Sequence, residues 1–114
     1  MIFVTGAAGF IGSNFVHYLK SNTYDNIVIL DKLTYAASTD NLNPHTFPIE
    51  IIDIADKKKL ERVFQKYRPR FVFHFAAESH VDNSIEDATP FVETNVTGTL
   101  NLLELSVMYK VEKF

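Results

Sequence analysis

The sequence predicts an α/β protein with a doubly wound parallel sheet, and three observations support this class. Short apolar runs alternate with longer amphipathic runs along all 114 residues. The short runs are rich in β-branched and aromatic residues, whereas the long runs place apolar residues at helical spacing. Irregular polar stretches follow the second and fourth short runs, at the end of the strands where such sheets bind ligands.

Four strands are expected, and each is apolar enough to be buried on both faces. They span residues 2–5, 27–31, 49–52 and 71–75. Crossover helices are expected over residues 11–21 and 56–67. A longer helix is expected from Pro90 to about Tyr109, because proline is tolerated in the first turn of a helix. The irregular stretches are residues 32–48 and 76–89.

The end of the chain falls where a fifth strand would begin, since residues 111–114 directly follow the long helix. We therefore expect residues 1–114 to form one incomplete domain that stops before its fifth strand. In that case residues 71–75 would form an open sheet edge, and the long helix would expose Phe91, Val96, Leu100 and Leu103. Open edges and apolar faces recruit partners, so we expect the isolated piece to self-associate.

The composition narrows the range of partners. A net charge of -3 leaves no positive field for a phosphate backbone, so nucleic acid is not an expected partner. The lysines at 57–59 stand among charges of both signs and read as a solvated helix face. The chain has no cysteine, which fits a cytoplasmic location, and it has no apolar run long enough to cross a membrane.

A glycine-rich segment, GAAGFIG at residues 6–12, joins the first strand to the first helix. Gly6 would allow a tight turn, Gly9 would let the backbone approach a pyrophosphate, and Gly12 would let the helix pack closely on the strand. The amides of Phe10 and Ile11 would then face the phosphates at the positive end of the helix dipole. The alternative is a glycine-rich turn without a ligand, and the next residues argue against it.

An aspartate at the end of the second strand supports a Rossmann-type dinucleotide site. Asp31 follows Gly12 by about 20 residues, the spacing of the acid that hydrogen-bonds the adenosine ribose. Its carboxylate would repel a 2′-phosphate, so NAD is favoured over NADP, although the neighbouring Lys32 could soften this discrimination. After the third strand, Asp53 and Ile54 would either hold the adenine or begin the turn into the next helix.

At this point the residues resemble the extended short-chain dehydrogenase/reductases. Two stretches, LDKLTYA at 30–36 and HFAAESHVD at 74–82, are similar to the signatures of dTDP-glucose 4,6-dehydratases, and the similarity extends over essentially the whole chain. The resemblance implies NAD as cofactor and a nucleotide sugar, dTDP-glucose, as substrate. It also implies that water is eliminated across C5 and C6 of the sugar, and we expect a homodimer when the protein is full length.

Carried over position by position, the resemblance assigns cofactor contacts to three groups of residues. The adenosine ribose would contact Asp31, Lys32, Leu33 and Thr34, and the adenine would contact Asp53 and Ile54. The pyrophosphate and nicotinamide side would be lined by Phe75, Ala76, Ala77, Glu78 and Ser79, with Thr94 also beside the cofactor. Ser79 would touch the sugar nucleotide as well, and His80 would either contact the substrate or only pack within its loop.

Three positions depart from the family pattern. Ala7 replaces a common glycine, Ala37-Ser38 replaces Gly-Asn, and Asn83 replaces an arginine. The first two exchange small residues for small residues, whereas Asn83 removes a charge on the substrate side. The alternative functions are another nucleotide-sugar epimerase or dehydratase of the same fold, and a non-catalytic NAD-binding module if the chain ends naturally at Phe114.

No catalytic residue is expected within the chain. The family's chemistry requires a Tyr-x-x-x-Lys pair beyond the fifth strand, together with a Thr-Asp-Glu stretch. Tyr109 and Lys113 have the right spacing but lie at the end of the long helix, so we interpret them as structural and expect no dehydratase activity from these 114 residues. His74 is expected to be a core histidine with its hydrogen bonds made, and no metal site is expected.

Overall fold

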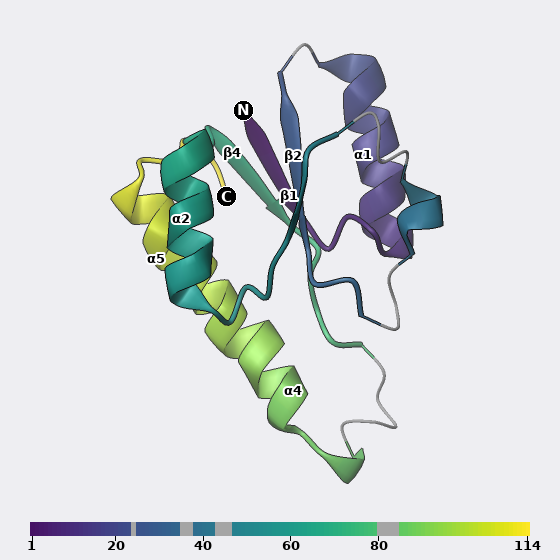
Figure 1. Cartoon of the computed structure of the whole chain (residues 1–114), viewed down its shortest axis with the longest axis vertical. Coiled ribbons are helices and arrows are strands. Elements are labelled where there is room, and N and C mark those ends of the chain that lie inside the picture. Colours follow the sequence, from purple (N-terminus) through teal and green to yellow (C-terminus); the bar gives the residue numbers. More distant parts are fainter. Residues whose placement is uncertain (24, 35–37, 43–46, 80–84) are drawn as a thin grey trace.

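The fold is a four-stranded parallel sheet in the order β3-β2-β1-β4, seen in a computed structural model that describes residues 1–23, 25–34, 38–42, 47–79 and 85–114. The strands are β1 (Ile2–Thr5), β2 (Ile27–Asp31), β3 (Ile49–Ile51) and β4 (Phe71–His74). Ile2 of the central strand β1 pairs with Ile27 on one side and Phe71 on the other. The predicted α/β class with a Rossmann-like parallel sheet is confirmed (Figure 1).

The burial of the strands depends on their place in the sheet. All residues of β1 and β2 are buried. The prediction that β3 and β4 are buried on both faces is wrong, because Ile51 is 71% exposed and Phe73 is 36% exposed. As the outer strands of this sheet they have one strand neighbour along their length and incomplete helical cover. β3 and β4 also end one residue earlier than expected.

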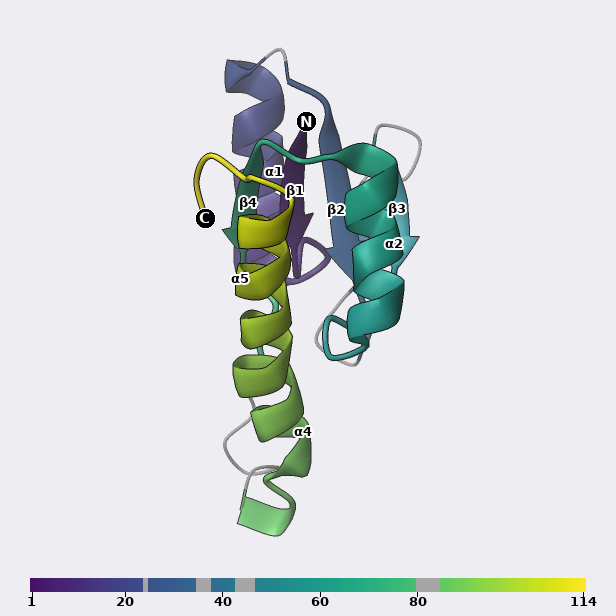
Figure 2. The same ribbon diagram turned by 90° about the vertical axis from the view of Figure 1, so that its left-hand side faces the viewer.

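Helices cover both faces of the sheet (Figure 1, Figure 2). Helix α1 (Phe10–Asn22) packs on one face, where Val16 and Leu19 join Ile2 and Val4 in one apolar cluster. Helix α2 (Lys57–Tyr67) packs on the other face, where Phe64 joins Phe3 in a second cluster. Alternate residues of β1 thus point to opposite helix layers, as the period of a strand requires.

The predicted long helix is present but is not regular. It runs through α4 (Thr89–Phe91), a π-helical segment η2 (Val92–Gly98) and α5 (Thr99–Met108). The π-helical segment was not predicted. Val96, Leu100 and Leu103 are exposed as expected, whereas Phe91 is partly buried, which corrects the expectation for that residue.

The polypeptide after α5 returns to the sheet. The Glu112 amide donates to the Arg70 carbonyl at 2.8 Å, and the Val72 amide donates to the Lys113 carbonyl at 3.0 Å. The expectation of a fully open edge at residues 71–75 is therefore wrong at the start of β4. Lys110 adopts a left-handed conformation (φ 57°), and the turn there brings the chain alongside β4.

Across the described parts of the chain, no helix combines the length and the apolar character needed to cross a membrane.

Candidate functional site

A cavity of about 280 Å³ opens at the carboxyl ends of the strands. Fifteen of the predicted cofactor residues line it. They are Gly6, Gly9, Ile11, Gly12, Asp31, Lys32, Thr34, Asp53, Ile54, Phe75, Ala76, Ala77, Glu78, Ser79 and Thr94. Phe10 and Leu33 are outside this lining, while Leu30 and Ile52 belong to it although their apolar strand positions had indicated only a core role.

The glycine loop between β1 and α1 forms one wall of the cavity. Gly6 has a φ of 67°, and a Cβ atom there would lie 2.5 Å from the Ala76 nitrogen. A Cβ atom on Gly12 would lie 2.3 Å from the Gly6 carbonyl oxygen. Gly9 differs, because its Cβ atom would meet only the Gly6 oxygen, at 3.3 Å. The fold itself thus requires Gly6 and Gly12, whereas Gly9, which also lines the cavity, is not required by close packing.

The start of α1 is suited to an anion. Gly9 precedes the helix and offers no side chain to cap it, so the amides of Phe10 and Ile11 have no side-chain partner from the N-cap position. These amides and the helix dipole favour a phosphate at this end. The Phe10 side chain is 82% exposed, so any role of this residue at the site would come from its backbone. Ala7 has no positive φ and therefore does not need the glycine that the family pattern has there.

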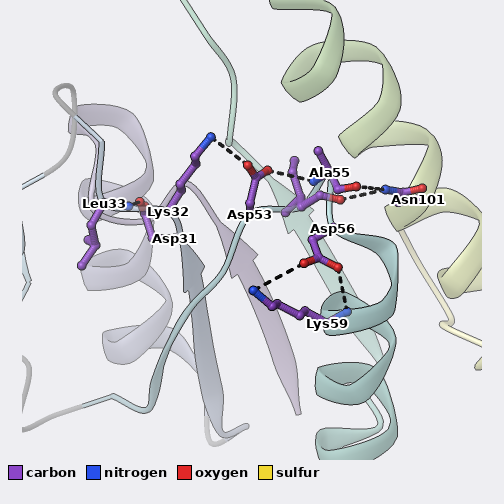
Figure 3. A network of polar contacts seen from close by, with 9 residues as sticks. Asp31, Lys32, Leu33, Asp53, Ala55, Asp56, Lys59 and Asn101 are labelled. Carbon is purple, nitrogen blue, oxygen red and sulfur yellow. Dashed lines mark hydrogen bonds and ion pairs between the residues drawn. The ribbon is translucent and has the colours of Figure 1, made fainter. Parts of the chain in front are cut away.

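Asp31 presents an oriented carboxylate at the end of β2 (Figure 3). The side chain is buried, and its two oxygens accept hydrogen bonds from the Ala8 amide at 2.9 Å and the Leu33 amide at 2.8 Å. Leu33 adopts a left-handed conformation with a φ of 55°, which is unusual for a residue with a side chain. Leu33 therefore acts here as the turn residue whose amide orients Asp31.

Asp53, which follows β3 next to β2, lines the cavity and pairs with Lys32. The Lys32 Nζ to Asp53 Oδ2 distance is 2.7 Å, and the other Asp53 oxygen accepts from the Ala55 amide at 2.9 Å. Burial raises the pKa of Asp53, but the hydrogen bonds from Lys32 and Ala55 outweigh it, and the pKa falls below its ordinary value. Asp53 thus begins a turn, as one of the two interpretations has it, and it also lines the cavity. Its contact with the adenine stays a prediction.

His74 connects β1 to the long helix. Thr99 Oγ1 donates to the Asn95 carbonyl at 2.8 Å, so it accepts from His74 Nε2 at 2.9 Å. In a neutral ring Nδ1 is then an acceptor, and Thr5 Oγ1 donates to it at 2.7 Å. Burial lowers the pKa of His74, which favours this neutral form. The predicted hydrogen bonding of His74 is confirmed, but its predicted place in the core is wrong, because the residue is only partly buried. Its two threonine partners were not predicted.

Asn95 fixes the segment that follows β4. Its Oδ1 accepts from the Glu78 amide at 2.9 Å, and its Nδ2 donates to the Glu78 carbonyl at 3.1 Å. The preceding residue, Thr94, lines the cavity, and both lie in the π-helical segment. Such segments occur frequently at functional sites. Thr94 thus lies at the predicted place, whereas the role of Asn95 was not predicted.

The remaining predicted residues lie at the cavity, away from it, or outside the described residues. Ser79 lines the cavity, whereas His80, Ala37 and Asn83 lie outside the described residues. Tyr109 is directed elsewhere, because its hydroxyl donates to Glu61 at 3.2 Å and its ring packs against Phe64. This agrees with its interpretation as structural. In the ranges that the structure describes, no group of three His, Cys, Asp or Glu side chains could hold a metal ion.

Comparison with known proteins identifies the family. A model of the NAD dependent epimerase/dehydratase family matches residues 2–114. The chain is 50% identical over 113 residues to a dTDP-glucose 4,6-dehydratase of Neisseria meningitidis, covering 95% of this chain and 32% of that protein. It therefore spans about a third of the length of this relative.

Solved structures are similar over almost the whole chain. The UDP-glucose 4-epimerase of Thermotoga maritima with UDP-glucose gives a TM-score of 0.92 at 40% identity, covering 99% of this chain and 36% of that one. A dTDP-glucose 4,6-dehydratase of Streptomyces venezuelae with NAD and TYD bound gives a TM-score of 0.87 at 42% identity, with coverage of 97% and 37%. The chain therefore belongs to the NAD dependent epimerase/dehydratase family.

Proposed function

We propose that residues 1–114 provide the NAD site of a dTDP-glucose 4,6-dehydratase, an enzyme that converts dTDP-glucose to dTDP-4-keto-6-deoxyglucose. One observation carries this proposal. The uncapped start of α1 and the oriented carboxylate of Asp31 line the same cavity, so one wall is suited to a pyrophosphate and another to ribose hydroxyls. The relative in Neisseria meningitidis supports the choice of reaction.

Different residues would bind different parts of the dinucleotide. The amides of Phe10 and Ile11 would bind the phosphates, and Gly9 leaves them space to approach. Asp31 would accept from the adenosine ribose hydroxyls, and Asp53 from the adenine amino group. Bound NAD would supply the chemistry by accepting a hydride from the sugar and returning it to the product.

The segment 75–79 would line the nicotinamide side. It is held in place by the Ala76 amide, which donates to Thr5 Oγ1 at 3.2 Å, and by the two hydrogen bonds between Asn95 and Glu78. These contacts orient the segment before any ligand binds. Ser79, at its end, lines the cavity and would also contact the sugar nucleotide.

We also propose that these 114 residues bind the cofactor without catalysing the dehydration. The support is that the single Tyr-x-x-x-Lys spacing uses Tyr109, which is directed toward Glu61 and packs against Arg68 and Phe64 rather than facing the cavity. Proton transfer requires a group within hydrogen-bond reach of the reacting hydroxyl, and Tyr109 is not so placed. Conversion of dTDP-glucose by the 114-residue chain would refute this.

An epimerase is the second candidate, favoured by the TM-score of 0.92 to a UDP-glucose 4-epimerase. The product distinguishes the two reactions, because the dehydratase removes one water from the sugar and the epimerase removes none.

A homodimer is proposed for the full-length protein. Its support is a row of exposed apolar residues along one face of the long helix, namely Val92, Val96, Leu100, Leu103 and Val107. Apolar rows of this kind favour helix-to-helix packing between subunits. A cytoplasmic location and the lack of a nucleic-acid partner remain predictions.

The test uses the native protein, purified and supplied with NAD and either dTDP-glucose or UDP-glucose. Mass spectrometry is expected to show loss of one water from dTDP-glucose and no reaction with UDP-glucose. Asp31→Asn, which keeps the shape of the side chain but removes its charge, is expected to weaken NAD binding. Interconversion of UDP-glucose and its epimer without loss of water would favour the second candidate.

A further inference from the structure

The charged residues around the cavity are unevenly distributed. Among its described lining residues, Lys32 is the single cation, and Asp31, Asp53 and Glu78 are carboxylates. Lys32 directly follows Asp31, the residue assigned to the adenosine ribose. A cation in this neighbourhood is the group that would accept the 2′-phosphate that distinguishes NADP from NAD. The state of Lys32 therefore bears on which dinucleotide the cavity accepts.

The Lys32 side chain points toward Asp53, which follows β3, rather than toward its chain neighbour Asp31 (Figure 3). Its Nζ lies 2.7 Å from Asp53 Oδ2. The hydrogen bond to Asp53 raises the pKa of Lys32 above its ordinary value, and Glu78 and Glu93 add to this effect. Asp31 does not compete for the ammonium in this arrangement, because its oxygens accept from two backbone amides.

Asp53 is the fixed partner of this pair. Its Oδ1 accepts from the Ala55 amide at 2.9 Å, so the turn after β3 orients the carboxylate. Two further hydrogen bonds hold that turn, since Asn101 Nδ2 donates to the Ile54 carbonyl at 2.9 Å and the Ala55 carbonyl at 3.2 Å. Lys32, in contrast, is a flexible side chain with about half of its surface exposed. The backbone therefore places Asp53, and Asp53 places Lys32.

We propose that Asp53 is a specificity-determining residue that favours NAD over NADP by keeping Lys32 paired and so unavailable to a 2′-phosphate. This inference rests on the proposed function. A 2′-phosphate that recruited Lys32 would leave Asp53 as an uncompensated carboxylate, and one that did not would face Asp31 without a cation. A ribose 2′-hydroxyl carries no charge, so it neither draws Lys32 away from Asp53 nor is repelled by Asp31.

The test is a double-mutant cycle on the native protein, with NAD and NADP affinities measured by calorimetry. Asp53→Asn removes the charge but keeps an oxygen that can accept from the Ala55 amide. It is expected to raise the ratio of NADP affinity to NAD affinity about tenfold, as release of a nearby cation to a phosphate predicts. In the Lys32→Met background the same substitution should raise the ratio by less than about threefold, because no cation is released. The ratio cancels any equal loss of adenine contacts.

Each outcome decides the proposal. Equal rises in the two backgrounds would mean that Asp53 acts through its own charge alone, which overturns the role assigned to Lys32. No change in the Asp53→Asn ratio would overturn it as well. Asp53→Ser, whose hydroxyl can also accept from Ala55, provides a second uncharged variant if the asparagine variant does not fold. Failure of the wild-type protein to bind NAD would instead refute the proposed function.

Discussion

Alanine substitutions at the three glycines of the phosphate loop should separate the requirements of the fold from those of the ligand. In Gly12→Ala the new Cβ atom would lie 2.3 Å from the Gly6 oxygen and 2.8 Å from the Ala7 Cα atom. Both are backbone atoms, so α1 must move away from β1. We expect a loss of roughly 3 kcal/mol in the free energy of unfolding, the upper range for overpacking. Gly6→Ala should cost a similar amount, because a φ of 67° adds strain to its own clash.

Gly9→Ala should behave differently. Its Cβ atom meets only the Gly6 oxygen, at 3.3 Å, and the φ of -76° suits any residue. We expect a change of at most about 1 kcal/mol in stability. Gly9 lines the cavity, so we expect the added methyl group to hinder a phosphate from reaching the amides of α1. Loss of one hydrogen bond to a charged group, about 1.5–3 kcal/mol, corresponds to an NAD affinity lower by about 10- to 150-fold.

Urea unfolding of the three variants measures stability, and calorimetric titration with NAD measures affinity. The expected pattern is an unstable Gly12→Ala and a stable Gly9→Ala that binds NAD weakly. Wild-type NAD affinity in Gly9→Ala would refute the assignment of this loop to the pyrophosphate. Wild-type stability in Gly12→Ala would refute the close packing of α1 on β1.

Three further predictions concern other parts of the chain. Because burial lowers the pKa of His74, its stabilising effect should be fully present above its ordinary pKa of 6.5 and lost as the pH falls through the lower folded value. Urea unfolding measured against pH should show this loss of stability in the wild type. A His74→Gln variant whose stability falls with pH at the same slope as the wild type would contradict this. Asn95→Ala should release the Glu78 backbone, with hydrogen exchange at the Glu78 amide roughly five- to tenfold faster. Asn95→Asp keeps the acceptor for that amide, so its exchange rate should lie between those of the wild type and Asn95→Ala. Unchanged exchange in Asn95→Ala would show that Asn95 does not hold the Glu78 backbone. If the protein forms the proposed homodimer, Leu103→Glu should sediment as a monomer. Gln65→Glu adds the same charge at an exposed position of α2 and should remain a dimer. A dimeric Leu103→Glu would place the interface elsewhere.

Much of the fold could be predicted because the local pattern and the tertiary packing agree. Residues 2–5 and 27–31 are continuous apolar runs that become the two central strands, and the spacing of Leu60, Val63 and Phe64 fixes the buried face of α2. The π-helical segment could not be predicted, since apolar spacing does not distinguish it from an α-helix. Burial of β3 and β4 was overestimated because their position at the sheet edge depends on strand order.

The residues of the candidate site likewise fall into those that could be predicted from the sequence and those that could not. Asp31 and the glycines could be identified because their spacing along the chain reflects one local unit. The pair between Lys32 and Asp53 and the contacts of His74 with Thr5 and Thr99 join residues that are distant in sequence, so only the folded structure reveals them. Leu30 was not predicted for another reason. An apolar residue in a strand indicates a place in the core, even where the end of the strand borders a cavity.

A crystal structure of the protein with NAD would test the proposed cofactor site most directly. We expect the dinucleotide in the cavity at the carboxyl ends of the strands, with the adenosine ribose hydroxyls donating to Asp31. The pyrophosphate is expected to face the amides of Phe10 and Ile11. An empty cavity at saturating NAD, or NAD bound at another place on the protein, would refute the proposed site.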